Sequence, residues 1–168
     1  MSEFKINTGV SEFSIYLPQT SECRSYSVSF GDFDNLVDVS VDNWGRIVDV
    51  DCISVAEICQ KEIELPDRET LRCYFSPYGP PEEDGEYYGW PLWINLHPEK
   101  RELNILLYTS SPQPEYCFED GRIELYYRKA DRYNEDTDEF DTVDLLECIR
   151  VLDLTDEEYA YLKRFCKE

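Results

Sequence analysis

Strict alternation of apolar and polar residues is the feature that most constrains the fold of this chain. In residues 24–30, Tyr26, Val28 and Phe30 alternate with three serines. Successive side chains of a β-strand point to opposite faces of a sheet, so this period of two predicts a strand with one buried and one solvated face. Three other segments show the same pattern: 11–17, 34–42 and 46–51. Because an Asn and a Gly fall between the last two segments, we predict a hairpin there.

The rest of the chain mixes strand and helix signals. Five further strands are predicted, at 70–76, 90–97, 102–108, 115–118 and 122–129. Helical spacing of apolar residues follows a capping-box pattern at 54–63 and again at 156–167, and a further helix is predicted at about 142–151. We therefore predict one α+β domain over residues 1–168, with mainly antiparallel sheet, one mid-chain helix and two C-terminal helices.

The charge of the chain excludes several classes of function. The 168 residues include 37 acidic and 16 basic side chains, which gives a formal net charge of −21. Such a surface repels phosphates, so neither direct nucleic-acid binding nor binding to anionic membranes is expected. The sequence shows no signal-peptide pattern and no apolar run of about 18 residues, which predicts a soluble, cytoplasmic protein. The seven cysteines are scattered and lack a C-x-x-C motif, which favours free thiols over disulfides or a zinc site.

The sequence contains no clear catalytic or metal-binding motif. The single histidine, His97, precedes Pro98 at a predicted strand end and has no nucleophile near it in sequence, so we interpret it as a turn residue. Residues 134–138 begin like a calcium-binding loop, but Glu139 replaces the required glycine and Leu145 replaces the final glutamate. We therefore predict no catalytic residue, no metal, no cofactor and no enzymatic activity.

The predicted hairpin of residues 34–51 is the first of three acidic regions. Its valines share one face, so the opposite face carries five aspartates: Asp34, Asp38, Asp42, Asp49 and Asp51. Carboxylates two residues apart on a strand stand about 6–7 Å apart, close to the spacing of backbone phosphates. A register that sets Asp38 opposite Asp49 would place like charges across the strand pair. The face is a candidate nucleic-acid mimic, with an ordinary solvated sheet face as the alternative.

The other two acidic regions lie in predicted connections. The connector 131–141 carries the second candidate set: Glu135, Asp136, Asp138 and Glu139. The loop 77–89 carries the third, which Trp90 and Trp93 follow: Glu82, Glu83, Asp84, Glu86, Tyr87 and Tyr88. Aromatic side chains anchor protein interfaces while charges steer association, so both regions are candidate partner-binding sites. The alternatives are a solvated spacer in the first case and aromatics that cover the core in the second.

The negative charge is spread over the whole chain, and this shapes the predicted function. Net charge is −7 over residues 1–60, −5 over 61–110 and −9 over 111–168, so no detachable tail supplies it. In size and charge the chain resembles the nucleic-acid mimics of phages and mobile elements, the antirestriction and anti-CRISPR proteins, although no motif carries the resemblance. It implies an inhibitor that binds a basic, nucleic-acid-binding nuclease or effector complex. The alternatives are an immunity or antitoxin-like protein that neutralises a basic toxin, and a carboxylate-based hydrolase.

Overall fold

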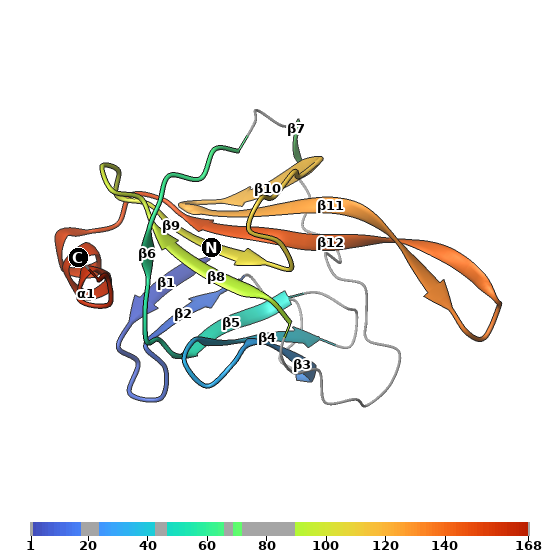
Figure 1. The fold of residues 1–168 in the computed structure, drawn as a ribbon, viewed down its shortest axis with the longest axis horizontal. Coiled ribbons are helices and arrows are strands. Elements are labelled where there is room, and N and C mark those ends of the chain that lie inside the picture. The colour runs from blue at the N-terminus through green and yellow to red at the C-terminus, as the bar shows by residue number, and fades with distance from the viewer. Residues whose placement is uncertain (1, 18–23, 43–46, 66–68, 72–89, 168) are drawn as a thin grey trace.

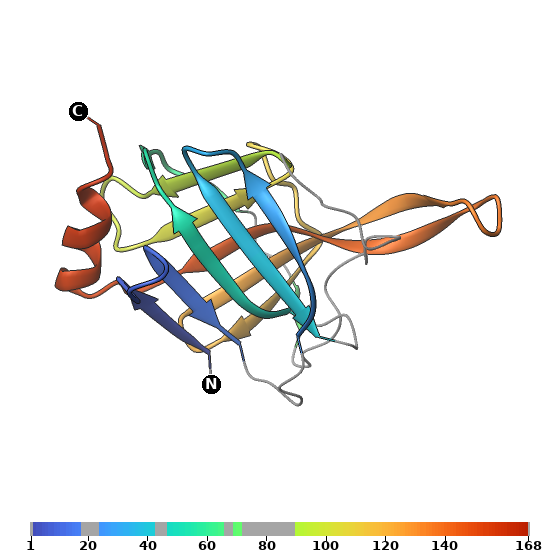
Figure 2. The same ribbon diagram turned by 90° about the horizontal axis from the view of Figure 1, so that it is seen from below.

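Two β-sheets packed face to face form the body of the protein (Figure 1). The computed structural model describes residues 2–17, 24–42, 47–65, 69–71 and 90–167. A short helix lies at one end of the sheets, and a long two-stranded extension projects from the opposite end (Figures 1 and 2). No helix in these ranges combines the length and the hydropathy needed to cross a lipid bilayer.

The smaller sheet holds the first part of the chain in five antiparallel strands. Their order across the sheet is β1 (Glu3–Ile6), β2 (Phe13–Tyr16), β5 (Ile47–Ser54), β4 (Leu36–Asp42) and β3 (Arg24–Gly31). The four alternating segments predicted as strands all lie in this sheet, so those predictions are confirmed. The prediction missed β1, whose four residues are too few for the alternation to stand out.

The larger sheet holds most of the remaining chain in seven strands. Their order is β6 (Cys59–Gln60), β8 (Leu92–Leu96), β9 (Leu103–Leu107), β12 (Glu139–Val151), β11 (Ile123–Asn134), β10 (Tyr116–Asp120) and β7 (Glu69–Leu71). The edge strands β6 and β7 pair in parallel with β8 and β10, and the other neighbours are antiparallel. The pairing is therefore mainly antiparallel, as the short turns predict.

Residues 61–65, which follow the edge strand β6, lie over the outer face of the larger sheet, and we call this segment the belt. Ile63 belongs there to a second apolar cluster, which also contains Leu106, Cys117, Tyr126 and Cys148. The smaller sheet covers the other face of the larger sheet. Because both faces are covered, all five residues of β9 are buried, and the contrast between an apolar and a solvated face is lost in this strand.

The main core lies between the two sheets. Alternate residues of the smaller sheet, such as Phe13, Ile15 and Val39, belong to the same buried cluster as alternate residues of the larger sheet, such as Ile105 and Ile149. Burying one large apolar side chain stabilises a fold by about 1.5–3 kcal/mol. Burial of these alternate apolar side chains between the two sheets is therefore the main driving force for folding of the sandwich.

The two sheets also meet through their backbones beside β3. The N–H of Gly31 donates to the carbonyl oxygen of Trp90 at 2.8 Å. Gly31 has a φ of +94°, and a Cβ at this position would lie 1.9 Å from the carbonyl oxygen of Asn35. Only glycine fits this close approach to Asn35, and the hydrogen bond from its N–H holds Trp90 against the end of β3.

The prediction of an α+β fold with three helices is wrong. The residues that the structure describes form twelve strands and one helix, α1 (Asp156–Lys163). The capping box predicted for this helix is confirmed: Thr155 accepts a hydrogen bond from the Glu158 N–H, and the Glu158 carboxylate accepts one from the Thr155 N–H. The helix ends at Lys163 rather than at residue 167.

The predicted mid-chain helix at 54–63 is absent because other contacts use its backbone groups. The side-chain oxygen of Asn35 accepts from the N–H groups of Ala56 (2.8 Å) and Glu57 (3.2 Å). The N–H of Ile58 donates to the carbonyl oxygen of Phe165 at 3.0 Å. Only the Ile58 contact takes a hydrogen bond from a helix that would begin at Ser54, because the N–H groups of Ala56 and Glu57 have no helical acceptor in a first turn. Residues 59–60 then pair with β8 as a strand, so tertiary structure overrides the capping-box pattern.

The predicted helix at 142–151 is part of β12. Tyr126 pairs with Cys148 and Tyr127 pairs with Leu146, so Glu147 is an extra residue in a β-bulge. The bulge shifts the alternation, and as a result Leu146 and Ile149 both lie in the main core. Their spacing of three residues imitates helical periodicity. The expected connector 131–141 is instead the paired far end of β11 and β12.

Candidate partner-binding surfaces

Serine hydroxyls hold two of the five predicted hairpin aspartates. Asp38 stands directly opposite Asp51, not opposite Asp49 as the sequence-based register has it. Ser29 donates to Asp38 and Ser14 donates to Asp51, each at 2.6 Å. These hydrogen bonds come from the strands on either side of the hairpin, and each offsets part of the repulsion between two facing carboxylates.

The hairpin does not present an unbroken row of surface charge. Asp42 is 3% exposed and Asp49 is 1% exposed, whereas Asp38 and Asp51 are half-buried. Among the five, only Asp34, in the turn before β4, is exposed. The phosphate-like row expected from the sequence is therefore interrupted at two of its positions. The third predicted set, Glu82, Glu83, Asp84, Glu86, Tyr87 and Tyr88, lies outside the described residues.

The second predicted set lies on the extension formed by β11 and β12. β10 pairs with β11 as far as Tyr127, and β9 pairs with β12 as far as Cys148. Beyond these points, the two strands pair with each other over seven positions, from Arg128 opposite Leu145 to Asn134 opposite Glu139. We call residues 128–145 the arm; its paired part is about 23 Å long at about 3.3 Å per residue. Figures 1 and 2 show it projecting from the body, in orange.

The far half of the arm is acidic and open to solvent. Every side chain that the structure describes between residues 131 and 142 is exposed. Residues 133–142 contain five acids and no Lys or Arg. The arm brings Glu135, Asp136, Asp138 and Glu139 together at its tip, as the sequence grouped them. The result is concentrated negative charge on a narrow projecting element.

An aromatic pair supports the tip. Tyr133 and Phe140 stand opposite each other, with ring centroids 5.5 Å apart. The Tyr133 hydroxyl donates to the carboxylate of Asp138, and this hydrogen bond raises the pKa of Tyr133. An isolated two-stranded hairpin is marginally stable in water, so such contacts help to keep the arm paired. Phe140 is 71% exposed and Tyr133 is 44% exposed, which leaves two aromatic surfaces among the acids.

A buried carboxylate fixes the root of the arm. Glu147, the bulge residue, is 2% exposed. Its carboxylate accepts from the Nε of Arg128 at 2.6 Å and from the N–H of Gln113 at 2.9 Å. These contacts join both arm strands to the segment before β10. The direction of the arm is therefore set by a hydrogen-bonded ion pair as well as by the ladder.

A tryptophan groove of about 570 Å³ lies where the two sheets meet. Its lining includes Asp32, Asp34, Glu57, Trp90 and Trp93. Trp90 is 39% exposed and is supported by an edge contact with Tyr108, with ring centroids 5.2 Å apart. The sequence points to both tryptophans, but it gives no signal for Glu57, because the groove combines four separate segments.

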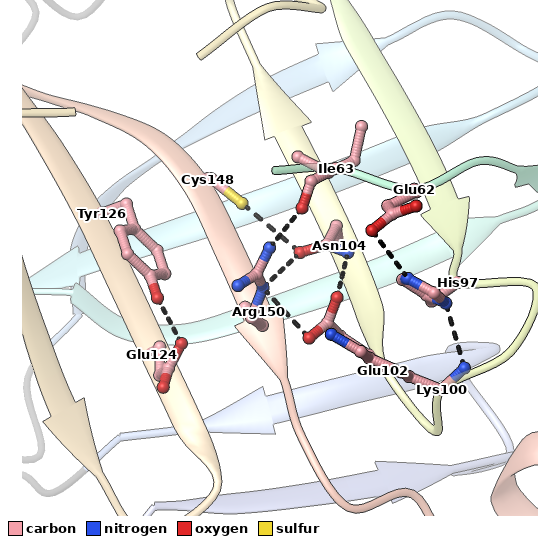
Figure 3. A network of polar contacts seen from close by, with 10 residues as sticks. All are labelled: Glu62, Ile63, His97, Lys100, Glu102, Asn104, Glu124, Tyr126, Cys148 and Arg150. Atoms are coloured by element: carbon pink, nitrogen blue, oxygen red, sulfur yellow. Dashed lines mark hydrogen bonds and ion pairs between the residues drawn. The ribbon is translucent and has the colours of Figure 1, made fainter. Parts of the chain in front are cut away.

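A second pocket, of about 540 Å³, lies beside the belt on the outer face of the larger sheet (Figure 3). Beneath it is a buried polar network. Arg150 donates from Nε to the side-chain oxygen of Asn104 (2.7 Å) and from its terminal nitrogen to the carbonyl oxygen of Ile63 (2.9 Å). The carboxylate of Glu102 lies 3.6 Å from the Arg150 Nε. We call this cavity the belt pocket.

His97 forms one wall of the belt pocket. Its Nδ1 accepts hydrogen bonds from the N–H groups of Glu99 and Lys100, each at 3.0 Å, which confirms its interpretation as a turn residue. Its Nε2 faces the carboxylate of Glu62 at 3.8 Å (Figure 3). No sequence motif predicts this contact, because the two residues lie on separate segments. Within the described ranges, no three His, Cys, Asp or Glu side chains are grouped to hold a metal ion.

The sequence matches no protein-family model, and a search of curated proteins finds no match.

Proposed function

We propose that this protein is an acidic inhibitor that binds a basic, nucleic-acid-binding surface of a nuclease or effector complex. The observation that carries the proposal is the arm, whose exposed acids project from the body on a two-stranded ribbon. A ribbon of this width fits into grooves that accept an α-helix or a nucleic-acid strand. Its insertion would exclude substrate by occupying the same basic channel.

Charge pairing supplies the physical basis. Lys and Arg side chains that grip phosphates form short, charge-assisted hydrogen bonds with carboxylates as well. A net charge of −21 also accelerates encounter with a basic partner and makes the association sensitive to salt. The partner is therefore expected to be a protein with a strongly basic channel, in the cytoplasm, where the free thiols remain reduced.

Exposed aromatics add an anchor to this electrostatic attraction. Phe140 and Tyr133 lie among the acids of the arm, and Trp90 and Trp93 line the tryptophan groove. Interfaces concentrate binding energy in a few aromatic and Arg residues, while the surrounding charges mainly set the association rate. The arm would thus supply steering and a hydrophobic contact from the same element.

Inhibition assays on purified nucleases and RNA-guided effector complexes test the proposal. We expect the protein to inhibit at least one of them, less strongly when nucleic-acid competitor or salt is added. The double variant Glu135→Lys/Glu139→Lys should weaken inhibition about tenfold or more. The matched control Glu99→Lys/Glu157→Lys changes the same charge on exposed residues outside the arm and should change inhibition by less than about twofold.

Two results would contradict this function. If the arm variant inhibits as strongly as the unchanged protein, the arm does not bind the partner. Tight binding to a partner that is insensitive to both salt and nucleic acid would instead favour an immunity or antitoxin-like protein with one cognate toxin.

A further inference from the structure

Several buried polar side chains lie in the belt pocket or directly beneath it. Asn104 is fully buried, and Glu102 and His97 are 7% and 3% exposed. Arg150 has only 12% of its side chain exposed. Removing such groups from water costs free energy that internal hydrogen bonds only partly offset. An apolar surface like the one under Ile63 would cover the sheet at lower cost.

His97 presents a fixed hydrogen-bond donor to this pocket. Because Nδ1 accepts from two backbone N–H groups, its lone pair is in use, and the proton of the neutral ring is on Nε2. The Nε2 atom is buried and has no hydrogen-bond partner, while 4% of the side chain is exposed. A buried donor without an acceptor destabilises the fold, because it has lost its hydrogen bond to water and gained none in return. A ligand oxygen in the pocket would remove that cost.

The tautomer of His97 also limits what the pocket can bind. A metal ion would need the lone pair of Nε2, but that nitrogen carries the proton. The pocket walls alternate in character: the Nε2 of His97 lies 3.8 Å from a Glu62 oxygen, and the Nε of Arg150 lies 3.6 Å from a Glu102 oxygen. Lys100 and Glu64 add one more donor and one more acceptor.

The alternation of hydrogen-bond donors and acceptors on the pocket wall suits hydroxyl groups better than ions. A hydroxyl accepts one hydrogen bond and donates another, so one oxygen can accept from His97 and donate to Glu62. A phosphate would face three carboxylates, and a simple cation would face Lys100, Arg150 and the N–H of His97. We propose that the belt pocket binds a small neutral polyhydroxyl compound of the monosaccharide class. Its volume of about 540 Å³ lies within the range of small-molecule sites.

The proposed ligand site is separate from the arm and does not depend on the inhibitor function. Its lining residues come from the belt, from the turn between β8 and β9, and from β12 (Figure 3). Glu62 is exposed and can change rotamer to admit a ligand, whereas the ring of His97 is held by its turn.

Imidazole NMR of the full-length protein tests the proposal, because its single histidine gives one set of ring signals. The nitrogen shifts of the free protein should show the Nε2–H tautomer. The probes are glucose, galactose, mannose, fucose, xylose, N-acetylglucosamine and myo-inositol, each titrated to about 50 mM. We expect at least one to shift the Nε2–H signal in a saturable manner. Inorganic phosphate, glycine and ammonium chloride at equal ionic strength serve as charged comparison probes.

Variants on the pocket wall separate binding from folding. Glu62→Ala removes an exposed acceptor and should weaken the binding probe about tenfold, as expected for loss of a hydrogen bond to a charged group. Glu99→Gln changes an exposed carboxylate of the same turn that does not line the pocket, and should leave affinity within about twofold. The proposal is overturned if no neutral probe shifts the signal, if a charged probe binds more tightly, or if both variants behave alike.

Discussion

The β4–β5 hairpin and the arm are both acidic two-stranded elements, yet they hold their carboxylates in opposite ways. In the hairpin, Asp49 is 1% exposed, and Asp38 and Asp51 accept hydrogen bonds from serines on adjacent strands. In the arm, every described side chain from 131 to 142 is exposed. A count of acids therefore says little about surface charge, because neighbouring strands decide which carboxylates reach solvent.

The difference follows from where each pair of strands lies in its sheet. β4 and β5 are interior strands, so donors such as Ser14 and Ser29 stand beside their carboxylates. The arm strands have no neighbour on either side among the described residues. Most acids of the far half are therefore open to solvent, and their repulsion from the negative body helps to keep the arm extended.

Truncating one apolar residue in each element should give the largest contrast in stability. Ile47 is 1% exposed in β5, and Ile47→Ala should lower the free energy of unfolding by about 2–5 kcal/mol because it leaves a cavity in the core. Phe140 is 71% exposed, and Phe140→Ala should cost about 1 kcal/mol or less, mainly the ring contact with Tyr133. Urea unfolding measures both. Equal losses would show that the arm is part of the cooperative core.

Substitutions at the root and at the tip of the arm should differ less in their effect on the free energy of unfolding. Glu147→Gln removes the charge that Arg128 contacts at 2.6 Å and should cost about 2 kcal/mol. Glu139→Gln changes an exposed carboxylate at the tip and should cost less than about 0.5 kcal/mol. Hydrogen exchange of the arm amides should rise in the first variant only. Similar exchange in both would mean that the Glu147 ion pair does not hold the arm.

Substitution of a serine next to the facing aspartates should lower the free energy of unfolding by a smaller amount. Ser29→Ala removes the donor to Asp38, which faces Asp51, and should cost about 1 kcal/mol, since both carboxylates retain partial access to water. High salt should reduce this loss by screening the repulsion. Ser27→Ala on the same strand, opposite Ser40, is the control and should be nearly neutral. A loss that does not respond to salt would argue against carboxylate repulsion.

The helix α1 holds a carboxylate in a third way, by an ion pair at its N-terminus, and the expected loss shrinks further as the pH falls. Glu158 of α1 accepts two hydrogen bonds from Arg122, at 2.6 and 2.7 Å. Although burial opposes the charged form, the bonds from Arg122 and Thr155 lower the pKa of Glu158. A lowered folded-state pKa stabilises the fold above the unfolded value of about 4.3, and this contribution is lost as the pH falls through the folded-state pKa.

Glu158→Gln tests this ion pair without removing the capping box, because Gln also serves at this position. We expect it to cost about 1 kcal/mol at pH 7, after allowance for solvent screening, and progressively less as the pH falls below about 4. Urea unfolding from pH 7 to pH 3 measures the difference. A penalty that stays constant with pH would show that the charge of Glu158 contributes nothing.

The sequence predicts the parts of the fold that local patterns determine. The alternation of Val37, Val39 and Val41 is enough to locate β4, and the Thr155–Glu158 pattern is enough to locate α1. The bulge at Glu147 is different, because one extra residue turns a strand pattern into an apparent helix. No local pattern reveals it.

The candidate sites also differ in whether the sequence alone reveals them. The acids of the arm tip are adjacent in sequence, so their grouping is visible without a structure, although their place at the end of a hairpin is not. The burial of Asp49 depends on tertiary neighbours. The belt pocket joins Glu62, His97 and Arg150 from distant segments, and only the fold brings them together.

The belt also constrains the order in which the protein folds. The chain enters it at edge strand β6 and leaves toward β7, which lies at the opposite edge of the same sheet. Residues 59–60 and 69–71 pair at these two edges with β8 and β10, and both partner strands come later in the chain. Because these pairings join distant parts of the chain, we expect closure of the belt to follow formation of the strands on which it rests. Cys117, whose pKa burial raises to about 12, and Cys148 lie in the cluster beneath it, so we expect their thiols to react with a labelling reagent only while the belt is open.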